Sequence, residues 1–167
     1  DIPGLPAVRS GKAEIVSVEA TPAQQAIMAD FILRAEAIRT GRVKPEEDNM
    51  LKLTGEARLM AIDPRLIRPD ADGTGSKLNV CIEDVYQVWK DTAASASTQL
   101  VFCDVGTPKA GKFNVYDEIR NVLLAKGVPE SEIAFVHDAT SEAQRQELFE
   151  RTRQGKVRIL IGSTGKL

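Results

Sequence analysis

The chain has 167 residues, enough for one compact domain or for one domain with a helical extension. Hydrophobic residues make up 43% and charged residues 28%, the balance of an ordinary globular protein, which excludes extensive disorder. The formal net charge of −2 argues against a uniformly basic nucleic-acid binder but allows a local basic strip. No apolar run approaches the ~20 residues of a membrane-spanning helix, so we expect no membrane partner.

Cysteine and histidine are scarce in this sequence. Cys81 and Cys103 stand in apolar surroundings without a CxxC spacing, and His137 is the sole histidine. These are too few ligands for a structural zinc site, so we expect no metal and two buried thiols in a reducing cytoplasm. The sequence starts at Asp1 without a basic-then-apolar leader, and we expect it to be a piece of a longer protein.

The first part of the chain predicts one strand and two helices. Residues Ala13 to Glu19 alternate apolar and polar side chains, a pattern typical of a strand. Thr21 opens T-P-A-Q, a capping box with proline at the first helical position, and Gly41 ends the predicted helix. A second helix is expected from Asn49 to Ala61, stopped by Pro64.

A loop rich in glycine, proline and aspartate follows from Leu66 to Ser76. We place a boundary here, between an N-terminal strand and helical portion (1–76) and an α/β core (77–167). The run DGTGSK at Asp72 to Lys77 lacks the spacing of a nucleotide phosphate loop and follows no strand. We interpret it as a loop that enters a helix.

The second part alternates strands and helices with short connections, which predicts a parallel sheet with right-handed crossovers. The strands are nearly all apolar, so we expect both of their faces to be buried. The expected elements are a helix at Lys77–Lys90, strands at Gln99–Cys103, Ile133–Val136 and Val157–Ile161, and helices at Asn114–Ala125 and Ser141–Gln154, the last with an S-E-A-Q capping box.

The exit of the Gln99 strand is a candidate anion site. Asp104, Gly106 and Thr107 lead into a loop with Lys109 and Lys112. Backbone amides, a hydroxyl and two ammonium groups could meet a phosphodiester there. Taken alone, a solvated hinge loop is the simpler interpretation.

The exits of the other two strands carry hydroxyls. His137 and Asp138 are adjacent on a chain expected to be extended, so their side chains should point apart and no catalytic relay is expected. Thr140 could cap the next helix or hold a phosphate. Ser163 and Thr164 occupy the usual position for ligand hydroxyls in α/β sheets, although two polar residues in a turn would look the same.

The order of these segments resembles the second RecA-like domain of superfamily-two helicases, as far as motif V. The similar segments are the F-C-D strand exit, then H-D-A-T, S-E-A-Q-R-Q-E-L-F-E-R and V-R-I-L-I-G-S-T. The front half resembles Swi/Snf-type translocases over Ile15–Met28, Met50–Ile67 and Lys77–Trp89. Asp63 stands where that family usually has histidine. Within that family, the sequence most resembles phage and mobile-element proteins that join a helicase to a DNA methylase.

The resemblance implies a three-layer RecA-like parallel sheet with an N-terminal helical portion. It implies a bacterial or phage protein of the cytoplasm, associated with the nucleoid, whose parent uses ATP and magnesium between this lobe and a first RecA-like lobe. No catalytic residue is expected in this chain, because the phosphate loop belongs to the first lobe and the arginine fingers should follow Leu167. The residues expected to contact the DNA backbone are Asp104, Gly106, Thr107, Lys109, Lys112, Thr140, Ser163 and Thr164.

Two other functions fit parts of the sequence. The first is a stand-alone α/β binding or regulatory domain of response-regulator-like topology, without a nucleic-acid role. The mildly acidic charge favours it, but the first sheet strand does not end in a carboxylate cluster. The second is a small hydrolase, for which no nucleophile and base can be paired.

Overall fold

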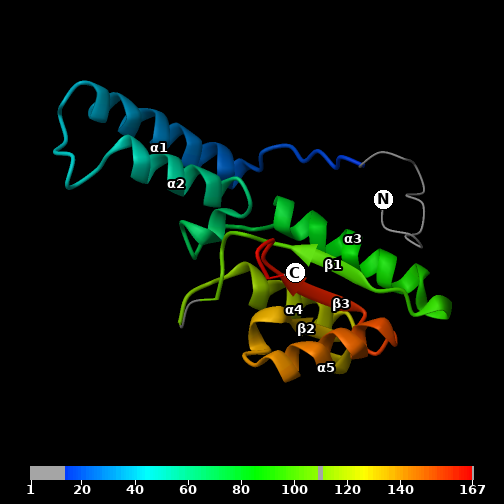
Figure 1. Ribbon diagram of the computed structural model, residues 1–167. Coiled ribbons are helices and arrows are strands. Elements are labelled where there is room, and N and C mark those ends of the chain that lie inside the picture. Colours follow the sequence, from blue (N-terminus) through cyan, green and yellow to red (C-terminus); the bar gives the residue numbers. More distant parts are fainter. Residues whose placement is uncertain (1–13, 109–110, 167) are drawn as a thin grey trace.

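The computed structural model describes residues 14–108 and 111–166 (Figure 1). It has a mixed α/β fold, as the sequence predicts, with a small parallel sheet and five α-helices within that range. None of the described helices is long and apolar enough to cross a membrane. The elements in chain order are α1 (Pro22–Arg39), α2 (Met50–Met60), α3 (Lys77–Asp91), β1 (Gln99–Phe102), α4 (Val115–Ala125), β2 (Ile133–Phe135), α5 (Glu142–Arg153) and β3 (Ile159–Gly162).

The sheet has the order β1-β3-β2, and both strand pairs are parallel. The last strand in the sequence is therefore the middle strand in space. Ile159, Leu160 and Ile161 are almost completely buried, because β3 has a strand on each side and helices over both faces. The run of apolar residues in β3 is thus explained by its central position.

Helices cover both faces of the sheet (Figure 1). On one face, α3 and α4 bury Ile82, Ile119 and Leu123 against Ile159 and Ile161. On the other face, α5 inserts Leu148 into a smaller cluster with Val136, Val157 and Leu160.

The expectation that β1 is buried on both faces is wrong. Gln99 and Val101 face the α3 side, but Leu100 is 53% exposed and Phe102 is 56% exposed. Leu100 is in register with Leu160, so both of these exposed side chains lie on the face that α5 covers elsewhere. The part of the chain described here places no helix over that side of β1, which leaves a strand with one covered face.

The predicted helix starts are confirmed. Thr21 and Gln24 form the expected capping box of α1, and Ser141 and Gln144 form that of α5. In both boxes the cap hydroxyl accepts a backbone N–H while the glutamine side chain accepts the N–H of the cap residue. These contacts need only four consecutive residues, which is why the sequence reveals them.

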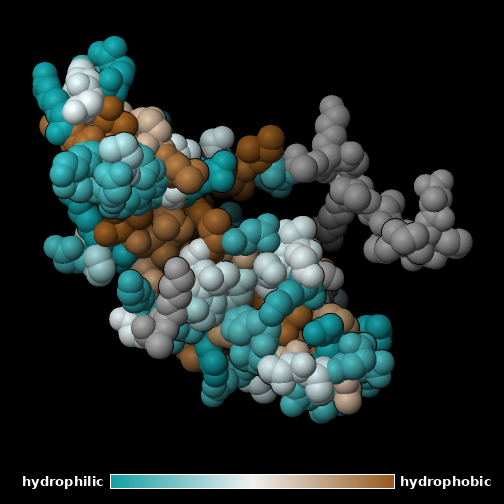
Figure 2. Space-filling model, turned by 60° about the vertical axis from the view of Figure 1, so that its left-hand side comes forward, coloured by the Kyte–Doolittle hydropathy of each residue, from teal (hydrophilic) through white to brown (hydrophobic). Residues whose placement is uncertain are grey.

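The expected first strand is absent from the described residues. Residues 14–19 have no regular structure and pair with no strand, while Ala13 lies outside the described range. Val16 and Val18 line a pocket together with Val80 and Val88 of α3, whereas Ile15 is 85% exposed. An alternating pattern specifies a strand only where a sheet edge lies alongside it, and here the segment meets a helix. Hydrophobic surface is visible on this segment and around the α1–α2 hairpin (Figure 2).

Helix α3 corrects the expectation for the thiols. Its inward stripe is Leu78, Ile82 and Val85, at the spacing of four and three residues that an α-helix requires. Cys81 lies beside this stripe and is exposed, and Cys103 after β1 is only half-buried. The expectation of two buried thiols is therefore wrong for Cys81.

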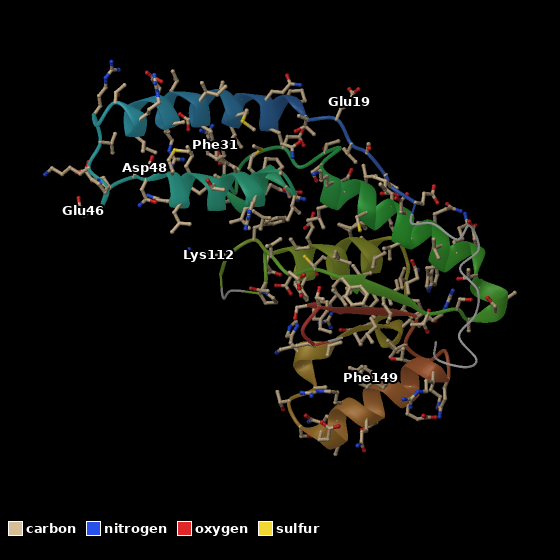
Figure 3. All side chains as sticks on the ribbon, turned by 45° about the horizontal axis from the view of Figure 1, so that its top comes forward. Glu19, Phe31, Glu46, Asp48, Lys112 and Phe149 are labelled. Atoms are coloured by element: carbon tan, nitrogen blue, oxygen red, sulfur yellow. The ribbon has the colours of Figure 1, made fainter. Side chains whose placement is uncertain are left out.

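Helices α1 and α2 form a hairpin that projects from the sheet portion (Figure 1). Phe31 of α1 points toward α2 and joins Ile27, Leu53 and Met60 in a separate apolar cluster (Figure 3). Arg34 ties the hairpin together by binding Asp48 at 2.8 Å and Glu56 at 2.5 Å. The hairpin thus has a core of its own.

Asp63 joins the hairpin to the sheet portion. Its side chain is 0% exposed and accepts two hydrogen bonds from the Arg65 guanidinium, each at 2.9 Å, and one from the Ser76 hydroxyl at 2.7 Å. Ser76 is the N-cap of α3, and Arg65 continues to Glu118 of α4 at 2.6 Å. One buried carboxylate therefore connects the end of the hairpin to two helices of the sheet portion.

We predict that Asp63→Ala lowers the free energy of unfolding by about 3 kcal/mol, because it removes one partner of a buried ion pair. Urea unfolding followed by circular dichroism measures the change. Asp30→Ala is the matched control, because the Asp30–Arg68 pair is half-exposed, and it should cost less than about 1 kcal/mol. Equal losses in the two variants would contradict the assigned role of Asp63.

Candidate functional site

The three strands end at the same edge of the sheet. Since β1, β3 and β2 are parallel neighbours, the loops that follow them start close together. Figure 1 shows the arrowheads pointing toward the side where the β1–α4 loop and the N-terminal end of α5 lie. Most of the residues predicted from the sequence as a site belong to these loops.

Asp104 and Thr164 make the closest contact between the β1 and β3 exits. The backbone N–H of Thr164 donates to Asp104 Oδ1 at 2.8 Å, and its hydroxyl donates to Asp104 Oδ2 at 2.7 Å. Both side chains are exposed to solvent. The hydrogen bond from the Thr164 hydroxyl, followed by that from its backbone, holds the pKa of Asp104 below the usual aspartate value. Hereafter this two-bond contact is called the Asp104–Thr164 clasp.

A small cavity of about 160 Å³ lies beside the clasp. Water takes up roughly 30 Å³ per molecule in the liquid, so the cavity has room for a group the size of phosphate. Thr107 comes from the β1 exit, His137 from the β2 exit, and Ser163 and Lys166 from the β3 exit, while Tyr116 comes from α4. The cavity therefore gathers hydroxyls and two nitrogen bases from all three exits.

The wall of the cavity is held by aromatic contacts. Tyr116 is buried, and its hydroxyl donates to the Cys103 carbonyl at 2.6 Å. Burial raises the pKa of Tyr116, so the phenol stays protonated and keeps this hydrogen bond. The His137 ring stacks on Phe135 at 5.2 Å and meets the edge of Tyr116 at 5.3 Å. These contacts fix the position of His137 relative to the sheet.

Gly106 shapes the β1–α4 loop. Its φ of +64° is a left-handed conformation, and an added Cβ would lie 2.5 Å from Val115 Cγ2. The Gly106 carbonyl also accepts the Val115 backbone N–H at 3.0 Å. Gly106 thus has a structural reason to be glycine, because the loop approaches the start of α4 closely.

Asp104, Gly106 and Thr164 do not themselves line this cavity, and neither do Thr140 and Lys112. Thr140 donates from its backbone and from its hydroxyl to Gln144 Oε1, at 3.0 and 3.1 Å, and thereby supports the start of α5. Lys112 is exposed on the β1–α4 loop (Figure 3). Lys109 lies outside the described residues.

The adjacent His137 and Asp138 do not point apart as expected. A 3-10 turn over Val136–Asp138 replaces the extended chain and brings His137 Nε2 to 3.5 Å from Asp138 Oδ1. The expectation that the two side chains point apart is therefore wrong. No described hydroxyl or thiol is hydrogen-bonded to His137, however, so a nucleophile is still missing from the pair.

The DGTGSK run starts a helix, in line with its interpretation from the sequence. Asp72 Oδ1 accepts the Thr74 N–H at 2.9 Å, and Ser76 caps α3 through the Asn79 N–H. Across residues 14–108 and 111–166, no group of three or more histidine, cysteine, aspartate or glutamate side chains could hold a metal ion.

Tyr116, Lys166 and His137 line the cavity, but none of them is among the site residues predicted from the sequence. Lys166 stands two residues after Thr164, so its position in the same loop was a usable signal. Tyr116 gave none, because its place in the cavity depends on how α4 packs against the sheet.

Comparison with protein-family models, with curated proteins and with solved structures finds no significant match for this chain.

Several groups at the strand exits are suited to contact an anion. Thr107 and Ser163 offer hydroxyls, and Lys166 offers an ammonium group next to the His137 ring. Hydroxyls, backbone amides and cations are the groups with which proteins hold phosphate without reading bases. Since His137 has no nucleophile beside it in the described chain, the arrangement favours binding over catalysis.

We predict that Thr164→Val raises the pKa of Asp104 toward the ordinary aspartate value, because it removes the hydrogen bond that most favours the ionised form. A carboxyl group whose pKa is lower in the folded state than in the unfolded state stabilises the fold at pH values above its unfolded-state pKa. This stabilisation is lost as the pH falls through the folded-state pKa. A ¹³C NMR titration of the side-chain carboxyl carbons measures the pKa of Asp104 in the wild type and in the variant. The pKa of Asp72, which is lowered by Thr74, is the internal control and should not move.

Proposed function

We propose that the chain is the second motor lobe of an ATP-dependent DNA helicase or translocase of the Swi/Snf-like type. In this proposal the fold is a RecA-like domain with an N-terminal helical portion. The strand exits hold phosphates of the DNA backbone, and the lobe completes the ATP site of the parent protein together with a first RecA-like lobe. Such a protein would work at the bacterial or phage nucleoid in the cytoplasm.

The observation that carries the proposal is the convergence of the β1 and β3 exits. Asp104 and Thr164 touch, and Thr107 and Ser163 line one cavity, although about sixty residues separate the two loops. The resemblance to superfamily-two helicases predicts that these two loops contact the DNA backbone. A parallel sheet with helices on both faces supports the same proposal, since RecA-like domains have that arrangement.

Backbone binding by this lobe needs no base recognition. Hydroxyls of Thr107, Ser163 and Thr140 would donate to phosphate oxygens, and Lys109 and Lys112 would supply positive charge. A motor that steps along DNA must hold each sequence equally well, so contacts to phosphates are suited to the task. The net charge of −2 then confines the DNA to a local strip rather than the whole surface.

ATP and magnesium belong to the parent protein in this proposal. The described residues do not fit a nucleotide site on their own, because the glycine-containing turn before α3 is used as a helix cap. They also lack a carboxylate cluster suited to magnesium. We therefore assign no catalytic residue to this chain.

The alternative is a stand-alone α/β binding or regulatory domain with no nucleic-acid role. It is favoured by the slightly acidic charge, and an anion site at the strand exits would also suit a small phosphorylated ligand. Salt dependence separates the two functions, because a DNA backbone contact releases counterions from several phosphates.

We predict that the chain binds labelled single- or double-stranded DNA with an affinity that falls as salt rises. Lys112→Ala should weaken binding and reduce the slope of log K against log salt by about 1, because one phosphate contact is lost. Fluorescence anisotropy at several salt concentrations measures both effects. Lys90→Ala is the matched control, since Lys90 is exposed on α3 away from the strand exits.

The DNA proposal fails if binding is absent at low salt, or if both lysine variants reduce it equally. The second result would indicate a general effect of charge. Binding of small phosphorylated ligands without binding of DNA would favour the regulatory domain instead.

We predict that the chain does not hydrolyse ATP, with or without DNA, because it carries neither a phosphate loop nor the arginine fingers. Phosphate release in the presence of magnesium measures the rate. ATP turnover that copurifies with this chain and responds to its substitutions would contradict the division of roles between the lobes.

A further inference from the structure

The donors of the β3 exit are already occupied by a carboxylate. Thr164 offers two groups that suit a phosphate oxygen, its backbone N–H and its hydroxyl, and both donate to Asp104 at 2.8 and 2.7 Å. An ionised carboxylate only accepts hydrogen bonds, as a phosphate does. The Asp104 side chain therefore takes the place that an anionic ligand of Thr164 would take.

We propose that the Asp104–Thr164 clasp is an autoinhibitory contact, in which Asp104 competes with a DNA phosphate for the two donors of Thr164. This inference rests on the proposed function, which it deepens by regulating the same site. The resemblance implies that Asp104 contacts the nucleic-acid backbone and supports binding. In the present proposal Asp104 weakens binding instead.

The charges around the clasp support competition. Asp104 is ionised at neutral pH, since the bonds from Thr164 lower its pKa. A phosphate that approached Thr164 with the clasp closed would meet this negative charge at close range. Lys166 lines the cavity and forms no ion pair with Asp104, so its ammonium group remains able to attract the phosphate.

The clasp is also placed where it can open. Both residues are exposed, so solvent or a ligand reaches the two hydrogen bonds directly. Asp104 and Thr164 follow the ends of β1 and β3 and lie outside the paired strands. Opening the clasp therefore requires rotation of side chains in two loops and leaves the sheet register intact. The cost of opening is that of an exposed contact, small enough for a phosphate to offset.

The test is a double-mutant cycle on the full chain. Asp104→Ala frees both donors and should tighten binding of single-stranded DNA about threefold to tenfold, the effect of one hydrogen bond that a phosphate gains from Thr164. Thr164→Val removes the hydroxyl. In that background, Asp104→Ala should increase the logarithm of the DNA affinity by less than half as much as it does in the wild type. Asp104→Asn, which keeps the shape of the side chain, should give an intermediate gain if the alanine variant folds poorly.

Asp91→Ala is the matched charge control. Asp91 is exposed at the end of α3, and its removal changes the net charge by the same amount without touching the strand exits. An equal gain in the Asp91 and Asp104 variants would overturn the clasp, because the effect would then follow net charge. A full gain that persists in the Thr164→Val background would overturn it as well.

A second measurement separates this inference from the proposed function. If wild-type chain binds DNA and Asp104→Ala does not improve it, the clasp is overturned and the DNA function stands. If no variant binds DNA, the function fails, and the Thr164 amide resonance is followed by NMR during titration with inorganic phosphate. A larger shift in Asp104→Ala than in the wild type then supports competition for the donors, and equal shifts overturn it.

Discussion

The burial of the Asp63 carboxylate is the constraint on which the arrangement of this protein depends. A fully buried charge must find partners within the fold, and Asp63 finds them in Arg65 and Ser76. Arg65 in turn binds Glu118 and lies over the Phe113 ring at 4.3 Å. Hairpin, α3 and α4 are thereby fixed to one another by directional contacts, which apolar packing alone would not specify. The family that the sequence resembles usually has histidine at this position, and aspartate here serves a structural role.

Because Asp63 and Arg65 fix the position of α4, they also influence the strand exits, which α4 contacts through Tyr116. Phe113 precedes α4 and Glu118 lies in its first turn, and Tyr116 between them reaches the Cys103 carbonyl and the His137 ring. The sheet order supplies the other half of the site, because it makes β3 the neighbour of β1 and brings Thr164 to Asp104. The proposed grip on phosphates and its proposed inhibition thus draw on the same two loops.

Local signals in the sequence were reliable where the structure is local. The capping boxes at Thr21 and Ser141 and the stop at Gly41 depend on contacts within a few residues. Expectations that depended on a distant partner were less reliable. Residues 14–19 have the pattern of a strand but lie against a helix, and β1 has the composition of a central strand but lies at an edge. A hydrophobic pattern shows which side chains can be buried, but it does not show which element packs against them.

The sequence by itself determined the α/β class, the bounds of most helices and the placing of hydroxyls and charges after each strand. These properties follow from helix capping, side-chain periodicity and turn chemistry, which act over a few neighbouring residues. The tertiary structure alone decided that β3 lies between β1 and β2, that Asp63 is buried and that Asp104 occupies the donors of Thr164. Each of these depends on contacts between residues 13 to 60 positions apart, as in the pairs Asp63–Ser76 and Asp104–Thr164. Such contacts form only when the whole chain packs, and no local pattern encodes them.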